Sequence, residues 1–309
     1  MEPFIRVAEV WTPSKEGSPL ELSAGLFDAA PAFGAISRKM CFGRAEGLPG
    51  RAWDEGRPVL LQRFEGSFFQ RTEAARAAGL SCAVALPIFV GGRLTSVVVL
   101  FCGDVQAHVG AIELWHNDPR ISTDLTLADG YFGSTPPELE ALTRDGSLSR
   151  GAGAPGLAWQ RDASVFIDNI GESRHFLRTQ VAASAGILRA LAIPCSTQAG
   201  GTWVLSLLSS VGSPIARRVE SWLPDGTHLQ RAYGFCEVQG RMPSNSAPPL
   251  AIDADGPIAR AWLTGAAQAV TGAAALPAGD DAPADGVQSV LAIPVVSDDA
   301  VSEIVALYF

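Results

Sequence analysis

Cysteine and histidine are scarce in this chain of 309 residues, and neither occurs in a metal-binding pattern. The five cysteines stand singly, with no CxxC pair, at Cys41, Cys82, Cys102, Cys195 and Cys236. Their odd number and long spacing argue against a disulfide framework and a zinc site. The four histidines form neither an HxxxH nor an HExxH motif, so we expect no metal site.

Lysine and long apolar runs are also scarce. Lys15 and Lys39 are the only lysines, the arginines are dispersed, and the net charge is −9, so we expect no nucleic-acid partner. No apolar run approaches the roughly 18–20 residues of a membrane span, and we expect no membrane association. Glu2 and Pro3 stand where a signal peptide would carry basic residues, which favours a cytoplasmic location.

The sequence contains a threefold internal repeat. Four sequence blocks recur in the same order. The first is marked by Trp11, Trp115 and Trp222, the second by Trp53, Trp159 and Trp262, and the third by Gly79, Gly186 and Gly286 followed by Pro87, Pro194 and Pro294. The fourth is the closing apolar strand, SVVVLFC, WVLSLLS and EIVALYF. The repeat predicts three domains of similar fold, at residues 1–106, 107–212 and 213–309.

Each copy predicts the order strand, strand, helix, strand, helix, strand, strand. The short helix that carries Trp53, Trp159 or Trp262 presents this residue to the core. The last two strands are apolar at almost every position and are joined in the first copy by Gly91-Gly92, a hairpin signature. We therefore expect an α+β fold, with an antiparallel sheet in each copy and short helices mainly on one face.

Residues 46–101, from GLPGRAW through AAGL to the ALP strand and its hairpin, resemble the core of a GAF domain. The second copy keeps the pattern at Gly156, Trp159 and Gly186, and the third keeps only its skeleton. The resemblance implies a pocket between the sheet and the short helices, which binds small molecules in some family members and nothing in others. Its characteristic cyclic-nucleotide, bilin and sulfoxide-reductase residue sets are not matched in this chain.

The long helices that begin and end typical GAF domains are missing. Only about six residues join the first two copies and about five join the last two, which leaves one apolar face of each sheet uncovered. We expect the three sheets to bury these faces against one another or against a second chain.

The first copy has the fullest motif and the most varied polar residues, so we expect any ligand pocket there. The candidate ligand-binding residues are Arg38, Cys41, Arg51, Phe68, Phe69 and Arg71, together with His175 of the second copy. For His175 the alternative is an exposed loop residue without a role. No GxSxG elbow, P-loop or triad occurs, and we expect no catalytic residues.

The sequence thus favours a non-enzymatic protein for small-molecule sensing or regulatory binding. The alternative is a ligand-free scaffold or protein-interaction module. The partners expected are a small-molecule ligand and a second copy or an effector protein. No cofactor is indicated.

Overall fold

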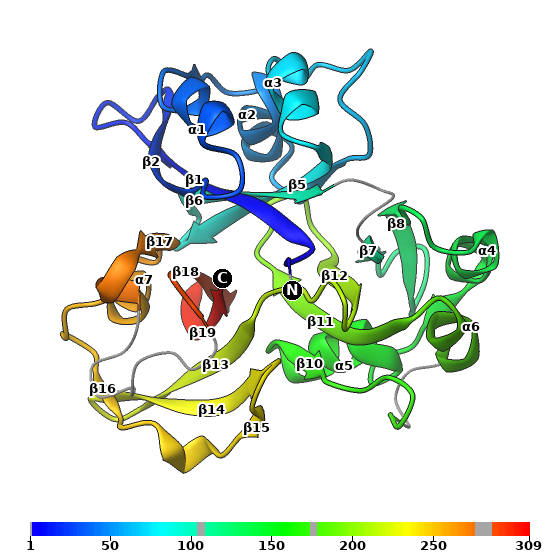
Figure 1. Ribbon diagram of the computed structural model, residues 1–309. Helices are drawn as coiled ribbons and strands as arrows, with labels where there is room; N and C mark the ends of the chain where they lie inside the picture. The colour runs from blue at the N-terminus through cyan, green and yellow to red at the C-terminus, as the bar shows by residue number, and fades with distance from the viewer. Residues whose placement is uncertain (1, 104–108, 174–177, 276–285) are drawn as a thin grey trace.

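The computed structural model describes residues 2–103, 109–173, 178–275 and 286–309. Within these residues the chain forms three antiparallel sheets, each from one contiguous part of the sequence. Figure 1 shows the sheets arranged around a common centre, with the short helices on the outside. None of the helices in the described part has the length and hydrophobicity needed to cross a membrane.

The first sheet has the strand order β3-β2-β1-β6-β5-β4. Its strands are β1 (Ile5–Pro13), β2 (Leu20–Leu26), β3 (Cys41–Phe42), β4 (Val59–Leu61), β5 (Leu80–Val90) and β6 (Arg93–Gly103). Its helices are α1 (Pro31–Ser37), α2 (Gly47–Glu55) and α3 (Thr72–Ala77). Gly91 and Gly92 join β5 to β6 with φ angles of 57° and 72°, a tight hairpin turn that glycine forms without strain.

The second and third sheets repeat this strand order, as β9-β8-β7-β12-β11-β10 and β15-β14-β13-β19-β18-β17. The second comprises β7 (Gly110–Asn117), β8 (Leu125–Tyr131), β9 (Ser147–Leu148), β10 (Val165–Ile167), β11 (Ile187–Cys195) and β12 (Thr202–Ser210), with α4 (Pro137–Asp145), α5 (Gly153–Arg161) and α6 (Thr179–Ser184). The third comprises β13 (Arg218–Asp225), β14 (His228–Cys236), β15 (Gly240–Met242), β16 (Leu250–Ala251), β17 (Gln268–Thr271), β18 (Ser289–Ser297) and β19 (Ala300–Tyr308), with α7 (Pro257–Thr264) and the 3-10 turns η1 (Ser244–Ser246) and η2 (Gly272–Ala275). The repeat's prediction of one shared strand order is confirmed, whereas the domain limits stay a prediction.

The predicted α+β class is wrong. The structure is mostly antiparallel sheet, with 44% strand and 20% helix. The helices are six to nine residues long, and each sheet also packs against the other two sheets. The α+β prediction rested on short helices that cover only one face of each sheet. The other face is also apolar and packs against the neighbouring sheets, so contact between sheets is a principal part of the packing.

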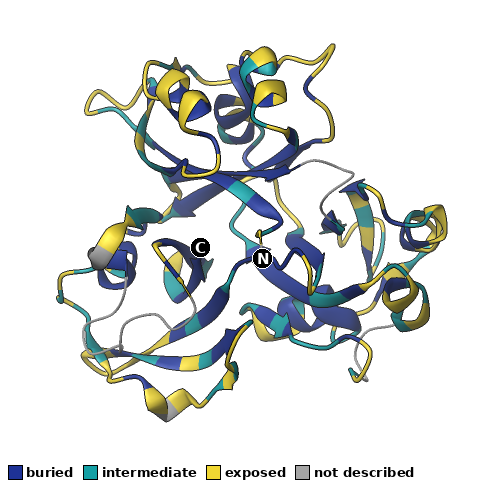
Figure 2. Ribbon diagram, in the orientation of Figure 1, coloured by how far each residue is buried: buried dark blue, intermediate teal, exposed yellow. Residues whose placement is uncertain are grey.

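The inward faces of the three sheets form one hydrophobic core. This central core, coloured as buried in Figure 2, contains buried residues from all three sheets. It includes paired positions on the last strand of each sheet, at Val98 and Leu100, Leu205 and Leu207, and Val305 and Leu307. The prediction that the sheets cover one another in place of long helices is therefore confirmed.

A second, outer core lies between each sheet and its helices. Trp11, Trp115 and Trp222 are at most 1% exposed in these outer cores. The short-helix residues Trp53, Trp159 and Trp262 are only partly buried at the edges of the same clusters. The expectation that these helix residues would be largely buried is therefore too strong, because their helices lie at the outer surface of the molecule.

The three sheets contact one another head to tail in a closed ring. The β5–β6 hairpin of the first sheet reaches the end of α7, where Thr95 donates to the Gly265 carbonyl over 2.6 Å. The loop after β11 reaches the end of α2, where Thr197 donates to the Gly56 carbonyl over 2.8 Å. In the third contact Ser297 of β18 donates to the carboxylate of Asp162, the residue that ends α5.

Each ring contact involves the residue that caps a helix with positive φ. Gly56 and Gly265 are the C-cap residues of α2 and α7, and both adopt the left-handed conformation at φ 61° and 63°. Asp162 takes the same conformation at φ 51° in the second copy. The neighbouring hairpin binds the backbone carbonyl of Gly56 and of Gly265, and the side-chain carboxylate of Asp162.

We expect residues 1–106, expressed alone, to aggregate or self-associate. Without the other sheets this fragment exposes the inward residues of β1, β5 and β6, an apolar face larger than soluble monomers usually carry. Size-exclusion chromatography with light scattering measures this directly, with the full chain as control. A well-dispersed, stable monomer of the fragment would contradict the shared-core packing.

Candidate functional site

The candidate ligand residues of the first copy do not line one open pocket. Phe69 and Arg71 lie together in the outer core, with the guanidinium 5.3 Å from the ring centroid. Arg51 stacks on the partly exposed Phe68 at 4.2 Å on the surface.

The remaining candidates lie apart from these two pairs. Arg38 lies over Phe27 at 5.0 Å, and Cys41 is exposed on β3. His175 lies outside the described residues. The interior that a GAF-type pocket would occupy is therefore built around Arg71.

Arg71 is part of a buried polar cluster in the outer core of the first copy. Its guanidinium pairs with both oxygens of Glu9, and it donates to the Ser37 hydroxyl over 2.5 Å. Glu9, which is fully buried, also accepts the indole N–H of Trp11 at 2.9 Å. Five aromatic rings, those of Trp11, Phe33, Phe42, Phe69 and Phe101, lie within 6 Å of the guanidinium.

The second copy contains the same cluster at matching positions. Arg178 binds Glu113 through two hydrogen bonds of 2.6 and 3.0 Å, and it also donates to Thr143. Glu113 accepts the indole N–H of Trp115 at 2.9 Å. Arg178 stands immediately before α6, just as Arg71 stands immediately before α3.

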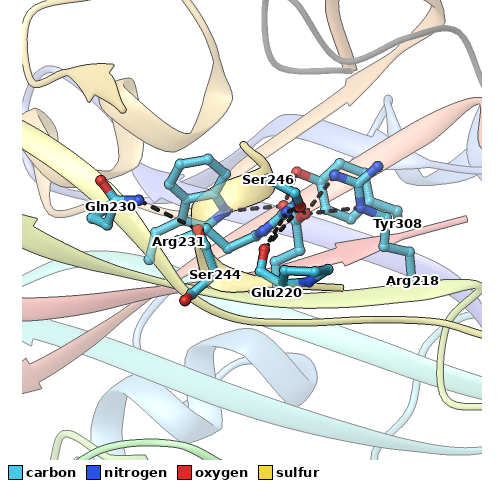
Figure 3. Close-up of polar contacts among 9 residues, drawn as sticks. Arg218, Glu220, Gln230, Arg231, Ser244, Ser246 and Tyr308 are labelled. Atoms are coloured by element: carbon cyan, nitrogen blue, oxygen red, sulfur yellow. Dashed lines mark hydrogen bonds and ion pairs between the residues drawn. The ribbon is translucent and has the colours of Figure 1, made fainter. Parts of the chain in front are cut away.

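The third copy keeps the carboxylate and the indole but takes its cations from other elements, as Figure 3 shows. Glu220 accepts from Arg231 of β14 at 2.7 Å and from Arg218 of β13 at 2.9 Å. It also accepts the Tyr308 hydroxyl at 2.7 Å and the indole of Trp222 at 3.0 Å. The third copy thus has two arginines beside its glutamate where the other copies have one, and the buried carboxylate is again paired with a cation.

The same arrangement recurs in all three copies, and we call these groups the Glu–Arg–Trp clusters. Each carboxylate is fully buried and bound by an arginine and an indole. The sequence carried a signal for them, a glutamate two residues before the first tryptophan of every copy, which the sequence analysis did not use. The clusters fill the space between sheet and helices with the protein's own groups.

We expect Arg71→Leu to lower the free energy of unfolding by about 3–5 kcal/mol, because it leaves the buried Glu9 carboxylate without a cation. Arg76→Leu is the matched control, since Arg76 forms exposed pairs with Glu65 and Glu73 and should cost less than about 1 kcal/mol. Urea unfolding of both variants measures the difference. Equal losses in the two variants would contradict a structural role for the buried pair.

Two cavities of ligand size lie between sheets. The first, of about 300 Å³, lies between the start of β1 and the end of β2 on one side and the start of β18 and the end of β19 on the other. Its lining includes Arg6, Asp28, Arg217, Ser289 and Phe309. Arg6 is ion-paired with Glu2 at its edge.

The second cavity, of about 280 Å³, lies between the second and third sheets. Apolar residues of β10, β11 and β13 form its walls, at Val165, Phe166, Leu191, Val219 and Leu223. Its polar lining residues include Ser164, Ser221, Tyr233 and Glu303. Two inter-sheet ion pairs, Arg189–Glu237 and Arg241–Asp168, also join these two sheets.

The side chain of Glu303 is 1% exposed, and its carboxylate binds three donors. The backbone N–H of Ser164 donates to it over 2.7 Å, and the hydroxyls of Ser164 and Ser221 donate as well. Sequence reasoning did not select Glu303 or Tyr233, because the cavity that they line forms only when the second sheet packs against the third.

The cysteines do not form a reactive or metal-binding group. Cys82, Cys102 and Cys236 are buried, and burial beside Cys82 raises the pKa of the Cys102 thiol. Burial raises the pKa of Cys195 to about 12. Among the residues that the structure describes, no group of three or more histidine, cysteine or acidic side chains could hold a metal ion.

We expect one fast-reacting thiol in the native chain at pH 8. Cys41 is exposed, whereas a pKa of about 12 keeps Cys195 protonated at this pH, and the other thiols are buried. Titration with a thiol-reactive chromophore before and after unfolding counts the groups, and Cys41→Ser should remove the fast phase. A second fast thiol, or a fast phase that survives this substitution, would contradict the assignment.

Comparison with known proteins yields structural likeness only. No protein-family model and no curated protein matches the chain. Solved structures with local likeness include the GAF domain of Aquifex aeolicus nlh2 in an inactive state, at 20% identity and TM-score 0.27, over 32% of this chain and 58% of that one. Another is the free methionine-R-sulfoxide reductase of Neisseria meningitidis in complex with its substrate, at 17% identity and TM-score 0.25, over 34% and 53%.

A third is a NreA protein of Staphylococcus aureus mutated in its nitrate-binding site, at 15% identity and TM-score 0.28, over 35% of this chain and 78% of that one. The chain thus spans about half the length of the first two. Each likeness covers about a third of this chain, so none of them assigns a ligand or an activity here.

Proposed function

We propose that this protein is a non-enzymatic regulatory binding protein that takes up a small molecule between its sheets. The observation that carries the proposal is the position of the two cavities of about 300 and 280 Å³, which lie where the third sheet meets the first and the second. Ligand sites favour such boundaries, and they combine apolar walls with a few polar groups, as both cavities do.

The proposal places the ligand elsewhere than the sequence analysis did. Arg71 and Phe69, expected to face a ligand, are held in the Glu–Arg–Trp cluster of the first copy. A ligand there would have to break a buried ion pair, which would leave a buried charge without its partner. The inter-sheet cavities need no such displacement, and a ligand in either one would contact two sheets at once.

Because such a ligand bridges two sheets, it would stabilise their contact and could signal through the relative position of the sheets. The partner that reads this signal would be an effector protein or a second copy. The same arrangement gives the runner-up function, a ligand-free scaffold. It is favoured by the three Glu–Arg–Trp clusters, in which an arginine of the chain itself already pairs with each buried carboxylate.

A thermal-shift screen of the full chain against a metabolite panel tests the proposal. A ligand at 100 times its Kd adds about 2.7 kcal/mol to the free energy of unfolding, which raises the melting temperature measurably. Ala29→Trp and Ala232→Trp form a matched pair, because each replaces an exposed alanine at the lining of one cavity.

We expect a stabilising compound to lose its effect in one of these two variants and to keep it in the other. No shift from any compound, or shifts that both variants keep, would favour the scaffold function instead.

A further inference from the structure

The cavity between the second and third sheets contains a buried charge without a counter-ion. Among the residues that the structure describes, no lysine, arginine or histidine lies within ion-pair distance of the Glu303 carboxylate. Its oxygens accept three hydrogen bonds, from the N–H and hydroxyl of Ser164 and from the hydroxyl of Ser221. A carboxylate offers about four acceptor positions, so one stays open.

The equivalent positions in the other copies show that the contact between sheets does not need this charge. When the three sheets are aligned by strand register, Ser96 of β6 and Trp203 of β12 occupy the position that Glu303 has in β19. The neutral Ser96 hydroxyl accepts the backbone N–H of Ala267 at 3.1 Å, the contact that corresponds to Glu303 with Ser164.

At the contact between the first and second sheets, Pro58 stands at the position of Ser164 and has no N–H to donate. Trp203 stands at the position of Glu303, and its side chain has no acceptor. Instead, the Arg57 guanidinium lies 5.0 Å from the Trp203 ring. Serine stands at the matched position in one contact and tryptophan in another. The contact between two sheets therefore does not require a negative charge at the position of Glu303.

Buried carboxylates in proteins are normally paired with a cation, because desolvating an unpaired charge is costly. Arg161 is the one basic residue that lines this cavity within the described chain, but it is exposed and forms no ion pair with Glu303. A ligand cation in the cavity would supply the missing partner.

The rest of the cavity suits an aromatic or apolar body carrying that cation. Phe166 and Tyr233 lie with ring centroids 5.6 Å apart at its wall, and such rings attract both cations and other rings. The Tyr233 hydroxyl is buried and forms no hydrogen bond with any described residue. Burial raises the pKa of Tyr233, so its hydroxyl stays protonated and is available to a ligand.

We propose that this cavity binds a primary ammonium group carried on an aromatic body, with Glu303 as its counter-ion and the Phe166 and Tyr233 rings as its wall. This inference rests on the proposed function, because it names the ligand class for one of its two cavities. It concerns equilibrium binding only and involves no covalent step.

Calorimetric titration of the full chain with three probes of similar shape tests the ligand class. The probes are 2-phenylethylammonium, the neutral 2-phenylethanol and the anionic 3-phenylpropionate. We expect the ammonium to bind at least tenfold more tightly than the alcohol, and the carboxylate not to bind.

Two substitutions test the role of Glu303. Glu303→Gln keeps the shape and removes the charge, and Glu303→Ser copies the residue that closes the equivalent first-sheet contact. Each should weaken ammonium binding at least tenfold while the chain still unfolds in a normal cooperative transition. Ser96→Ala is the control, because it alters the matching contact between the first and third sheets and should leave ammonium binding unchanged.

Failure of this inference differs from failure of the proposed function. If the ammonium does not bind, or binds equally in the Glu303 variants, the cation assignment is overturned. If another compound of the panel is still lost in Ala232→Trp, the cavity remains a binding site for a different ligand class. If no compound binds at either cavity, the proposed function falls with it.

Discussion

The single apolar core shared by three sheets is the constraint on which the rest of this structure depends. Each sheet is apolar on both faces, and its short helices cover only the outer one. At about 25 cal/mol for each Å² of apolar surface, an uncovered inner face would be strongly unfavourable in water. Packing the three sheets against one another covers all three inner faces at once. A chain with only two copies, or with long linkers between the copies, would not cover them in this way.

The closed ring of three sheets explains why the two cavities lie at boundaries between sheets and why those boundaries differ. The three contacts that Ser96, Trp203 and Glu303 make with a neighbouring copy are equivalent in position but differ in chemistry, with serine, tryptophan and glutamate at the matched site. Identical copies would give three identical contacts, so divergence between copies is what allows the boundaries to differ in the side chains that line them. A ligand at such a boundary acts on the ring as a whole, since each sheet contacts both of the others.

The sequence predicted the repeat, the shared strand order and the sheet-on-sheet burial, because tryptophan, glycine and proline markers and doubly apolar strands are local features. It failed where the answer depends on packing between distant segments. The helices α1 and α4 were not predicted, and the α+β class gave too much weight to helices of one or two turns. Arg71 was predicted to bind a ligand, and the sequence does not show that it lies at hydrogen-bond distance from Glu9, 62 positions away. Glu303 could not be selected at all, since its partner Ser164 belongs to another copy.

Native-state hydrogen exchange as a function of urea tests the shared core most directly. The slowest amides of β6, β12 and β19 belong to three different sheets but to one hydrophobic core. If that core is a single cooperative unit, these amides should exchange with one common free energy and one common urea dependence. Three separate free energies, with one sheet opening while the other two stay protected, would contradict the account.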